Sequence, residues 1–245
     1  VFIDTPGLIK PKNSLGDYMV KSVTSSVADV DACLLVVEAN TKISKADEEL
    51  VHRFKDLGVP ALLAINKIDL LQDKSVLMEQ IAKLSALYDF EAVVPVSAQD
   101  GNGMDALREE LIALAEPGGH FFSEDTLTDQ PERAIVAEII REKSLHALDD
   151  EIPHGIAVCI DRMKQRKGQN IMDIEATIVC ERDSHKGIVI GKGGAMLKKI
   201  GSNARYEIER LLEEQVNLKL WVKVKKDWRD SDFLIKNFGY DKKEY

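Results

Sequence analysis

The stretch Ala-Leu-Leu-Ala-Ile-Asn-Lys-Ile-Asp, residues 61–69, joins an uninterrupted apolar run to a polar loop. Two further short apolar runs occupy residues 32–37 and 93–96. Runs of this length without polar alternation are typical of parallel strands that are covered on both faces. Amphipathic stretches at residues 44–57, 74–88 and 103–115 predict helices between and after them. This β-α-β-α rhythm predicts an α/β sandwich.

Polar motifs follow two of these predicted strands directly. Asn-Lys-Ile-Asp begins at Asn66, and Ser97-Ala98 comes one strand later. Both loops are expected at the carboxyl edge of the sheet, where open α/β sheets bind ligands. The Asp69 carboxylate has two acceptors for the N1–H and 2-amino donors of guanine, a pair that adenine lacks, so guanine selection is predicted. Lys67 would lie across the base, Asn66 would tie the loops together, and the Ala98 N–H would reach guanine O6.

A third motif, Asp4-Thr5-Pro6-Gly7, stands near the start of the chain. Asp4 would hold Mg²⁺ through water, and the Gly7 N–H would point at a γ-phosphate, because glycine lets the backbone approach closely. The polar segment 8–25 would be a switch that the γ-phosphate orders. An ordinary polar loop after a strand explains part of this segment equally well.

Together the three motifs resemble the translation-factor branch of P-loop GTPases. In that branch a phosphate-binding loop, G-x-x-x-x-G-K-[ST], precedes the first motif, and no such loop stands before Asp4. Val1-Phe2-Ile3 has the pattern of a strand end, which indicates a fragment or a late start. Compared with the family that the chain resembles, we expect the P-loop, switch I and two strands to be missing, on the order of 60 residues. Leu8 stands where Ras-like relatives carry a water-orienting Gln. Leu8 cannot orient water, so slow or assisted hydrolysis is expected and no catalytic residue is assigned.

Charge separates the two halves of the chain, whose net charge is −9. Residues 1–118 carry 11 Lys and Arg against 19 Asp and Glu, which gives −8. Residues 119–245 carry 22 against 23, which gives −1. Within the second half, residues 182–199 hold five basic residues and one acidic residue. A local basic patch of this kind suits a phosphate-backbone partner.

The second half has a different predicted order of elements, α-β-β-α-α-β. Glu116-Pro117-Gly118-Gly119 ends the last helix of the first half, and a polar stretch continues to about Gln130. After a helix that starts near Pro131 we predict strands at 155–162 and 173–181, a hairpin loop at 163–170, a glycine turn at 191–194, two short helices at 195–200 and 203–214, a strand at 218–225 and a terminal helix within 229–245.

The glycine turn is part of the motif Val-Ile-Gly-Lys-Gly-Gly, residues 189–194, with Ile200 downstream. It matches V-I-G-x-x-G-x-x-x-x-x-I and resembles a KH domain of type II. The glycines would press the backbone against a sugar–phosphate chain beside an apolar groove for about four unpaired nucleotides. The predicted RNA-binding residues are Ile190, Gly191, Lys192, Gly193, Gly194, Lys198 and Lys199. The lysines of 218–225 fit either a solvated edge strand or a further RNA contact.

The combination resembles the Era family of bacterial ribosome-assembly GTPases over essentially the whole chain. The expected fold is α/β: a partial P-loop GTPase parallel sheet domain at 1–118, a linker at 119–130, and an α+β type II KH domain with a C-terminal helix at 131–245. The resemblance implies GTP and GDP as ligands, Mg²⁺ as cofactor, and the 3′ end of 16S ribosomal RNA and the 30S subunit as partners. GTP hydrolysis would be the switch.

The GTP-binding residues carried over from this resemblance are Asp4, Thr5, Pro6, Gly7, Leu8, Asn66, Lys67, Asp69, Ser97 and Ala98. The resemblance also implies a cytoplasmic monomer with peripheral membrane contact. The cysteines, Cys33, Cys159 and Cys180, lack metal-binding spacing and fit reduced core thiols.

Two alternatives stay open. The chain as it stands could be a KH-type RNA-binding module with a nonfunctional nucleotide site. It could also belong with double-GTPase assembly factors whose KH-like domain is structural, although the single GTPase domain and the basic glycine loop argue against this.

Overall fold

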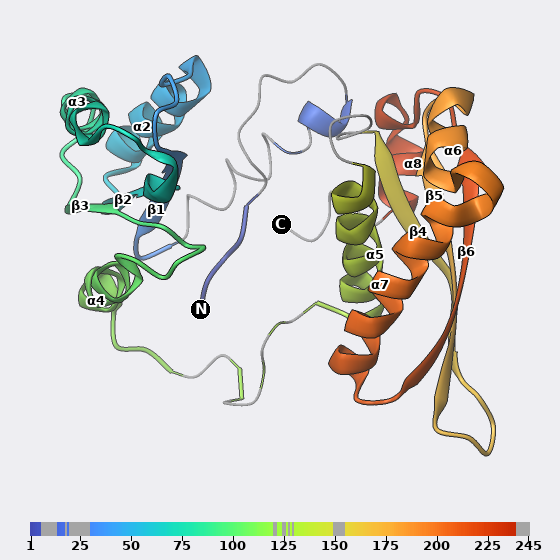
Figure 1. The fold of residues 1–245 in the computed structure, drawn as a ribbon. Helices are drawn as coiled ribbons and strands as arrows, with labels where there is room; N and C mark the ends of the chain where they lie inside the picture. The colour runs from blue at the N-terminus through green and yellow to red at the C-terminus, as the bar shows by residue number, and fades with distance from the viewer. Residues whose placement is uncertain are drawn as a thin grey trace. The chain divides into compact units, whose positions relative to one another are not determined.

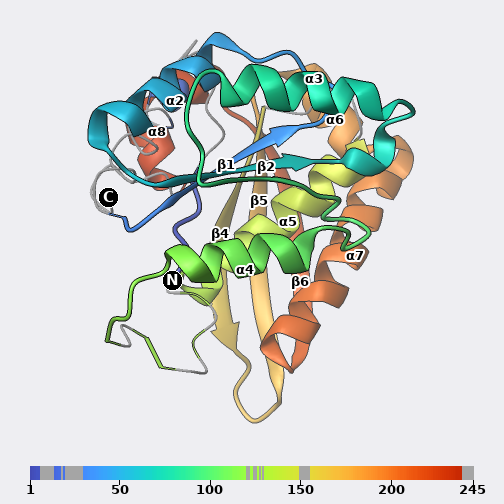
Figure 2. The ribbon, with the colours of Figure 1, turned by 90° about the vertical axis from the view of Figure 1, so that its left-hand side faces the viewer.

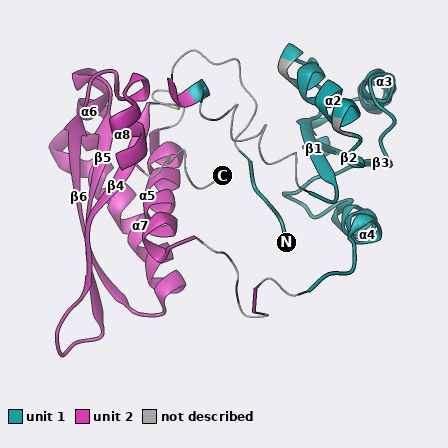
Figure 3. Ribbon diagram, turned by 180° about the vertical axis from the view of Figure 1, so that it is seen from behind, with its two compact units in different colours: residues 1–12, 16–121, 245 teal, residues 13–15, 122–244 magenta. Residues whose placement is uncertain are grey.

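The computed structural model describes residues 1–5, 14–17, 19, 30–119, 122–123, 126, 128, 130–148 and 155–238. These residues fall into two compact units, which Figure 3 colours separately. Residues 30–119 belong to the first unit and residues 130–238 to the second.

The first unit contains a three-stranded sheet in the order β1-β2-β3 (Figure 1). The strands are β1 (Cys33–Glu38), β2 (Ala61–Asn66) and β3 (Ala92–Pro95), and both neighbouring pairs are parallel. The helices are α2 (Lys45–Leu57), α3 (Lys74–Ser85) and α4 (Met104–Leu114). The parallel sheet and its helices are therefore confirmed, and each strand starts and ends within about one residue of its predicted bounds.

Helices cover both faces of this sheet, as Figure 2 shows with α2 and α3 above the strands and α4 below them. On one face Leu63 and Ile65 of β2 are fully buried in a cluster with Phe54 of α2. On the other face Ala64 of β2 is buried in a cluster with Leu107 of α4. Because side chains alternate along a strand, burial on both sides explains the uninterrupted apolar run.

The strand end predicted at residues 1–3 was wrong. Val1, Phe2 and Ile3 are exposed by 87%, 82% and 53%, and none of them pairs with a strand among the described residues. An apolar triplet forms a strand only where a neighbouring strand supplies backbone hydrogen bonds. The predicted site residues Pro6, Gly7 and Leu8 lie outside the described residues.

The second unit has the predicted α-β-β-α-α-β order. Its elements are α5 (Glu132–Leu148), β4 (Ile156–Gln165), β5 (Ile171–Cys180), α6 (Asp183–Ile190), α7 (Ala195–Leu212) and β6 (Gln215–Val224). The sheet order is β4-β5-β6, with β4 and β5 antiparallel and β5 and β6 parallel. One buried cluster joins all three strands to α5, α6 and α7.

Two details of this unit differ from the prediction. The two short helices expected at 195–200 and 203–214 are one helix, α7, which continues through Gly201. A Cβ at this glycine would lie 3.4 Å from Leu220 Cδ1, so Gly201 allows α7 to approach β6 and does not end the helix. The hairpin loop is also shorter than expected, because β4 runs to Gln165 and β5 starts at Ile171.

The predicted terminal helix is confirmed as α8 (Asp232–Asn237), which follows a short 3₁₀ turn, η5 (Trp228–Asp230). Trp228 is 1% exposed, and its ring meets Phe238 edge-on at a centroid distance of 5.4 Å. Arg229 is paired with Glu181, at the end of β5. Within the described ranges, no helix is both long and apolar enough to span a bilayer.

Candidate functional site

The first candidate site is the base-binding edge, which comprises residues 66–69 at the end of β2 and residues 97–98 after β3. Asn66 joins its two loops. Its side-chain oxygen accepts hydrogen bonds from the N–H of Lys67 at 2.8 Å and from the N–H of Ala98 at 3.0 Å. Two donors on one oxygen fix which end of the amide points inward. The predicted tie between the loops is therefore present.

The second loop of this edge is fixed by its own turn. Ser97 is 1% exposed, and its N–H donates to the Asn102 carbonyl at 2.9 Å. The Ser97 hydroxyl accepts the Asp100 N–H at 3.3 Å. A side chain at Gly103 would collide with the Pro95 carbonyl, and the φ of Gly103 is +77°. Glycine is therefore required where α4 starts beside the end of β3.

The polar groups that would meet a base differ in their availability. Asp69 is exposed, and its carboxylate has no hydrogen-bond or ion-pair partner among the described residues. The Lys67 ammonium forms an ion pair with Glu38 at 2.8 Å, and both side chains are about half exposed. The Ala98 N–H already donates to Asn66, so a base carbonyl would have to share this donor.

Asp4 and Thr5 are exposed and lie outside the sheet. A carboxylate oxygen of this kind suits Mg²⁺, which usually takes one or two carboxylates and completes its shell with phosphate oxygens and water. In the part of the chain that the structure describes, no three His, Cys, Asp or Glu residues are grouped to hold a metal. Asp4 therefore fits a magnesium site that a nucleotide phosphate would complete.

The second candidate site begins at the glycine turn between α6 and α7. Gly191, Gly193 and Gly194 all have positive φ, at +70°, +58° and +80°. A Cβ at Gly191 would lie 2.7 Å from the Cβ of Met196, so any other residue there would displace the first turn of α7. Lys192 and Gly193 are exposed at the tip of the turn. The backbone of this turn is thus accessible to a ligand.

A cavity of about 360 Å³ continues from this turn along α7, and we call it the RNA groove. It is lined by Gly194 of the glycine turn, by Leu197, Lys198, Gly201, Ser202 and Arg205 of α7, and by Leu218 and Leu220 of β6. The leucines give it an apolar floor, and two cations stand on its α7 side. This composition suits bases that stack on apolar surface while their phosphates meet positive charge.

The structure divides the predicted RNA residues into two groups. Gly194 and Lys198 line the groove. Lys192 and Lys199 are exposed but are not part of its lining, and Ile190 is half-buried beneath the turn. The prediction missed Ser202 and Arg205, although residues 198, 201, 202 and 205 have the spacing of one helix face.

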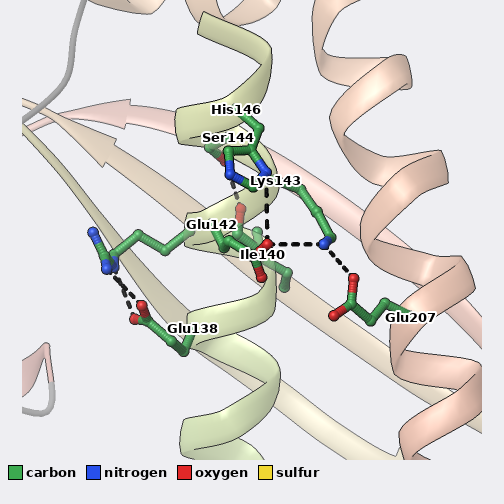
Figure 4. Close-up of polar contacts among 8 residues, drawn as sticks. Glu138, Ile140, Glu142, Lys143, Ser144, His146 and Glu207 are labelled. Carbon is green, nitrogen blue, oxygen red and sulfur yellow. Dashed lines mark hydrogen bonds and ion pairs between the residues drawn. The ribbon is translucent and has the colours of Figure 1, made fainter. Parts of the chain in front are cut away.

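Helix α7, which lines the groove, is linked to α5 by an ion pair. Lys143 pairs with Glu142 of its own helix at 3.0 Å and with Glu207 of α7, as Figure 4 shows. The Lys143 side chain is 18% exposed, and the hydrogen bond to Glu207, followed by that to Glu142, raises the pKa of Lys143 above its usual range. The next residue of α5 is the buried Ser144, whose hydroxyl donates to the Ile140 carbonyl of the same helix at 2.7 Å. The Lys143–Glu207 pair therefore links α5 to α7.

Two family models match the chain. The elongation factor Tu GTP binding domain matches residues 1–117, and the KH domain matches residues 151–229. The first match contains the base-binding edge and the second contains the glycine turn.

Curated relatives match nearly the whole chain. GTPase Era of Ruminiclostridium cellulolyticum is 50% identical over 240 residues, which cover 98% of this chain and 80% of that protein. GTPase Era of Clostridioides difficile is 48% identical and covers 99% and 82%. Among solved structures, a variant of Aquifex aeolicus Era bound to GDP·AlF4⁻ is 36% identical, with a TM-score of 0.89 over 97% of this chain and 80% of that one. A complex of Era with MgGDPNP and nucleotides 1506–1542 of 16S ribosomal RNA matches with the same identity, coverage and TM-score.

Proposed function

The chain belongs to the Era family of GTPases, and from this premise we propose how it works. In its natural full length it binds GTP, hydrolyses it, and binds the 3′ end of 16S ribosomal RNA while it assists assembly of the 30S subunit. The observation that carries this proposal is the presence in one chain of a base-binding edge tied by Asn66 and a glycine-lined RNA groove. GTP hydrolysis is the switch that changes the affinity for RNA.

In this proposal Asp69 selects the base. Its free, exposed carboxylate accepts the N1–H and 2-amino hydrogens of guanine, and Lys67 covers the ring. Asn66, Ser97 and Ala98 hold the two loops at the spacing that the base needs. Asp4, Thr5, Pro6, Gly7 and Leu8 would face the phosphates, and Asp4 would hold Mg²⁺, which supplies charge neutralisation when it is bound. Leu8 has no polar atom in its side chain, so another group must orient the attacking water.

In the second unit the RNA backbone passes over Gly191–Gly194. Lys192 and Lys198 neutralise phosphates, and the bases lie on Leu218 and Leu220 in the groove. This arrangement suits single-stranded RNA, because only unpaired bases can enter an apolar slot of this size. The alternative, an RNA-binding module with a nonfunctional nucleotide site, predicts the same groove but no guanine-dependent behaviour.

The experiment that tests the proposed function measures nucleotide and RNA binding in the same natural full-length protein. Wild type is expected to bind GDP and GTP, with ATP failing to compete. Asp69→Asn is expected to weaken GDP binding about 100-fold or more, because an amide cannot accept from both guanine donors. The same variant should bind xanthine nucleotide better than wild type does. In the absence of nucleotide, the variant and wild type should bind an oligonucleotide with the 3′-end sequence of 16S RNA equally well.

Asp56→Asn, an exposed position on α2 of the same unit, is the matched control and should change neither affinity. Equal binding of ATP and GTP by wild type would contradict the guanine assignment, and binding of RNA with no binding of either nucleotide would favour the RNA-binding module.

We also propose that the protein is a cytoplasmic monomer with peripheral membrane contact, as the family resemblance implies. Sedimentation of the full-length protein should give a single monomeric species. Flotation with vesicles of anionic lipid should carry a fraction of it upward, and this fraction should fall as salt is raised.

A further inference from the structure

Gln80, on α3 of the first unit, is a buried amide whose two ends contact the backbone of a distant segment. The residue is 6% exposed. Its side-chain oxygen accepts the Asn40 N–H at 3.0 Å, and its side-chain nitrogen donates to the Glu38 carbonyl at 3.0 Å. A buried amide without such partners would cost free energy, and this donor–acceptor pair fixes the orientation of the amide.

The segment that Gln80 holds lies at the carboxyl end of β1, beside the base-binding edge. Asn40 has a φ of +63°, a conformation that a residue other than glycine keeps only when its surroundings hold it. The Ala39 N–H donates to the Asn66 carbonyl at 2.7 Å. The Glu38 carboxylate forms the ion pair with Lys67 at 2.8 Å. One buried side chain therefore fixes the backbone of a segment that contacts both Asn66 and Lys67.

Lys67 is itself in the left-handed region, with a φ of +65°. Its backbone N–H is bound by Asn66 and its ammonium by Glu38, so both of its ends are fixed. Asp69 follows two residues later in a single 3₁₀ turn, and its own carboxylate has no partner among the described residues. The position of Asp69 therefore depends on how the preceding residues, Lys67 above all, are held.

From these contacts we infer that Gln80 and Glu38 are positioning residues for guanine recognition. Gln80 fixes residues 38–40, Glu38 holds Lys67, and Lys67 sets where Asp69 meets the base. This inference rests on the proposed guanine site. Two hydrogen bonds to one carboxylate need closer alignment than one does. A loosened Asp69 therefore loses the bond to the 2-amino group first.

The test compares GDP with IDP, whose hypoxanthine base lacks the 2-amino group. Calorimetric titration of the natural full-length protein gives the ratio of the IDP Kd to the GDP Kd. Gln80→Met removes both amide contacts at similar volume, and Glu38→Gln removes the charge that holds Lys67. We expect this ratio to fall about three- to tenfold in each variant. Glu79→Gln, on the exposed side of the same helix, is the matched control and should leave the ratio unchanged.

The ratio separates positioning from folding, because both nucleotides bind the same folded fraction. If Gln80→Met does not fold, Glu38→Gln still decides the matter, since the Glu38 side chain is 45% exposed. A wild-type preference for GDP that both variants retain would overturn the positioning role and leave the guanine site intact. A wild type that binds IDP as tightly as GDP would overturn the guanine site, and this inference with it.

Discussion

The base-binding edge and the RNA groove are built from different kinds of chemical group. At the base-binding edge, side-chain groups of Asn66, Gln80 and Glu38 hold loops that follow parallel strands. In the RNA groove, glycines bring backbone to the surface and apolar residues form the floor. Selecting one base requires fixed polar atoms, whereas gripping a sugar–phosphate chain requires an accessible backbone and positive charge. Substitutions should therefore break the two sites separately and through different mechanisms.

The largest expected effect is in the groove. Gly191→Asp combined with Gly194→Asp places side chains where φ is positive and where a Cβ at residue 191 would meet Met196. The two carboxylates also repel phosphate. We expect affinity for a 3′-end 16S oligonucleotide to fall about 100-fold or more, measured by fluorescence anisotropy.

Gly168→Ala is the matched control for this prediction. Gly168 lies in the β4–β5 loop with a φ of +73° and open space around it. The alanine substitution therefore introduces similar backbone strain away from the groove. RNA affinity should survive in this control, and GDP affinity should survive in both proteins. Normal RNA binding by the aspartate double variant would refute the groove assignment.

A second, smaller effect distinguishes two neighbouring lysines. Lys198 lines the groove and Lys199 does not, although both are exposed on α7. We expect Lys198→Ala to weaken RNA binding about three- to tenfold and to reduce the salt dependence of log K by about one phosphate contact. Lys199→Ala should have the weaker effect on both. Equal losses would mean that charge density on α7 matters and that the groove lining does not.

The third prediction compares one kind of ion pair in the two units. Lys143→Met removes the link between α5 and the groove helix, where the Lys143 side chain is 18% exposed. We expect the free energy of unfolding to fall by about 1 kcal/mol, seen by calorimetry as a melting temperature lower by about 2–4 °C. Lys83→Met removes a solvent-exposed pair with Glu79 on α3, so its effect on the melting temperature should be clearly smaller. A larger loss at Lys83 than at Lys143 would contradict the role given to the α5–α7 link.

The smallest effect is in the pH dependence of that link. The hydrogen bonds to Glu207 and Glu142 raise the pKa of Lys143 above its ordinary value of 10.5. The stabilisation is therefore complete below pH 10.5 and is lost as the pH rises through the higher folded-state pKa. The stability difference between wild type and Lys143→Met should be constant from about pH 7 to 10 and should shrink above that range. A stability difference between wild type and Lys143→Met that grows above pH 10 would contradict the raised pKa of Lys143.

Sequence pattern predicted the backbone of both units well and their polar contacts less well. The apolar runs of β1, β2 and β3 are continuous because both faces are buried, which makes them recognisable without coordinates. Gly201 was misjudged as a helix boundary, because its packing against Leu220 depends on a strand that comes later in the chain. Gln80 gave no signal at all, since one glutamine in an amphipathic helix looks like any other until its partners at Glu38 and Asn40 are located.

The sequence predicted one part of the RNA groove but not the other. Its turn was predicted from the glycine spacing, and Lys198 and Arg205 share one face of α7 at a spacing that the sequence contains. The sequence does not show that Leu218 and Leu220 form the apolar floor of the groove. Their position beside α7 is set by the parallel pairing of β6 with β5.

The central claim is that the bound nucleotide controls RNA binding. The most direct test measures the RNA affinity in two nucleotide states. The natural full-length protein is titrated with the 3′-end 16S oligonucleotide, once saturated with GDP and once with a non-hydrolysable GTP analogue, both with Mg²⁺. We predict a difference in Kd of about fivefold or more, which is the lower end of typical coupling between two sites. The difference should vanish in Asp69→Asn at the same nucleotide concentrations. Identical RNA affinities in the two nucleotide states would contradict the account and would leave two independent sites on one chain.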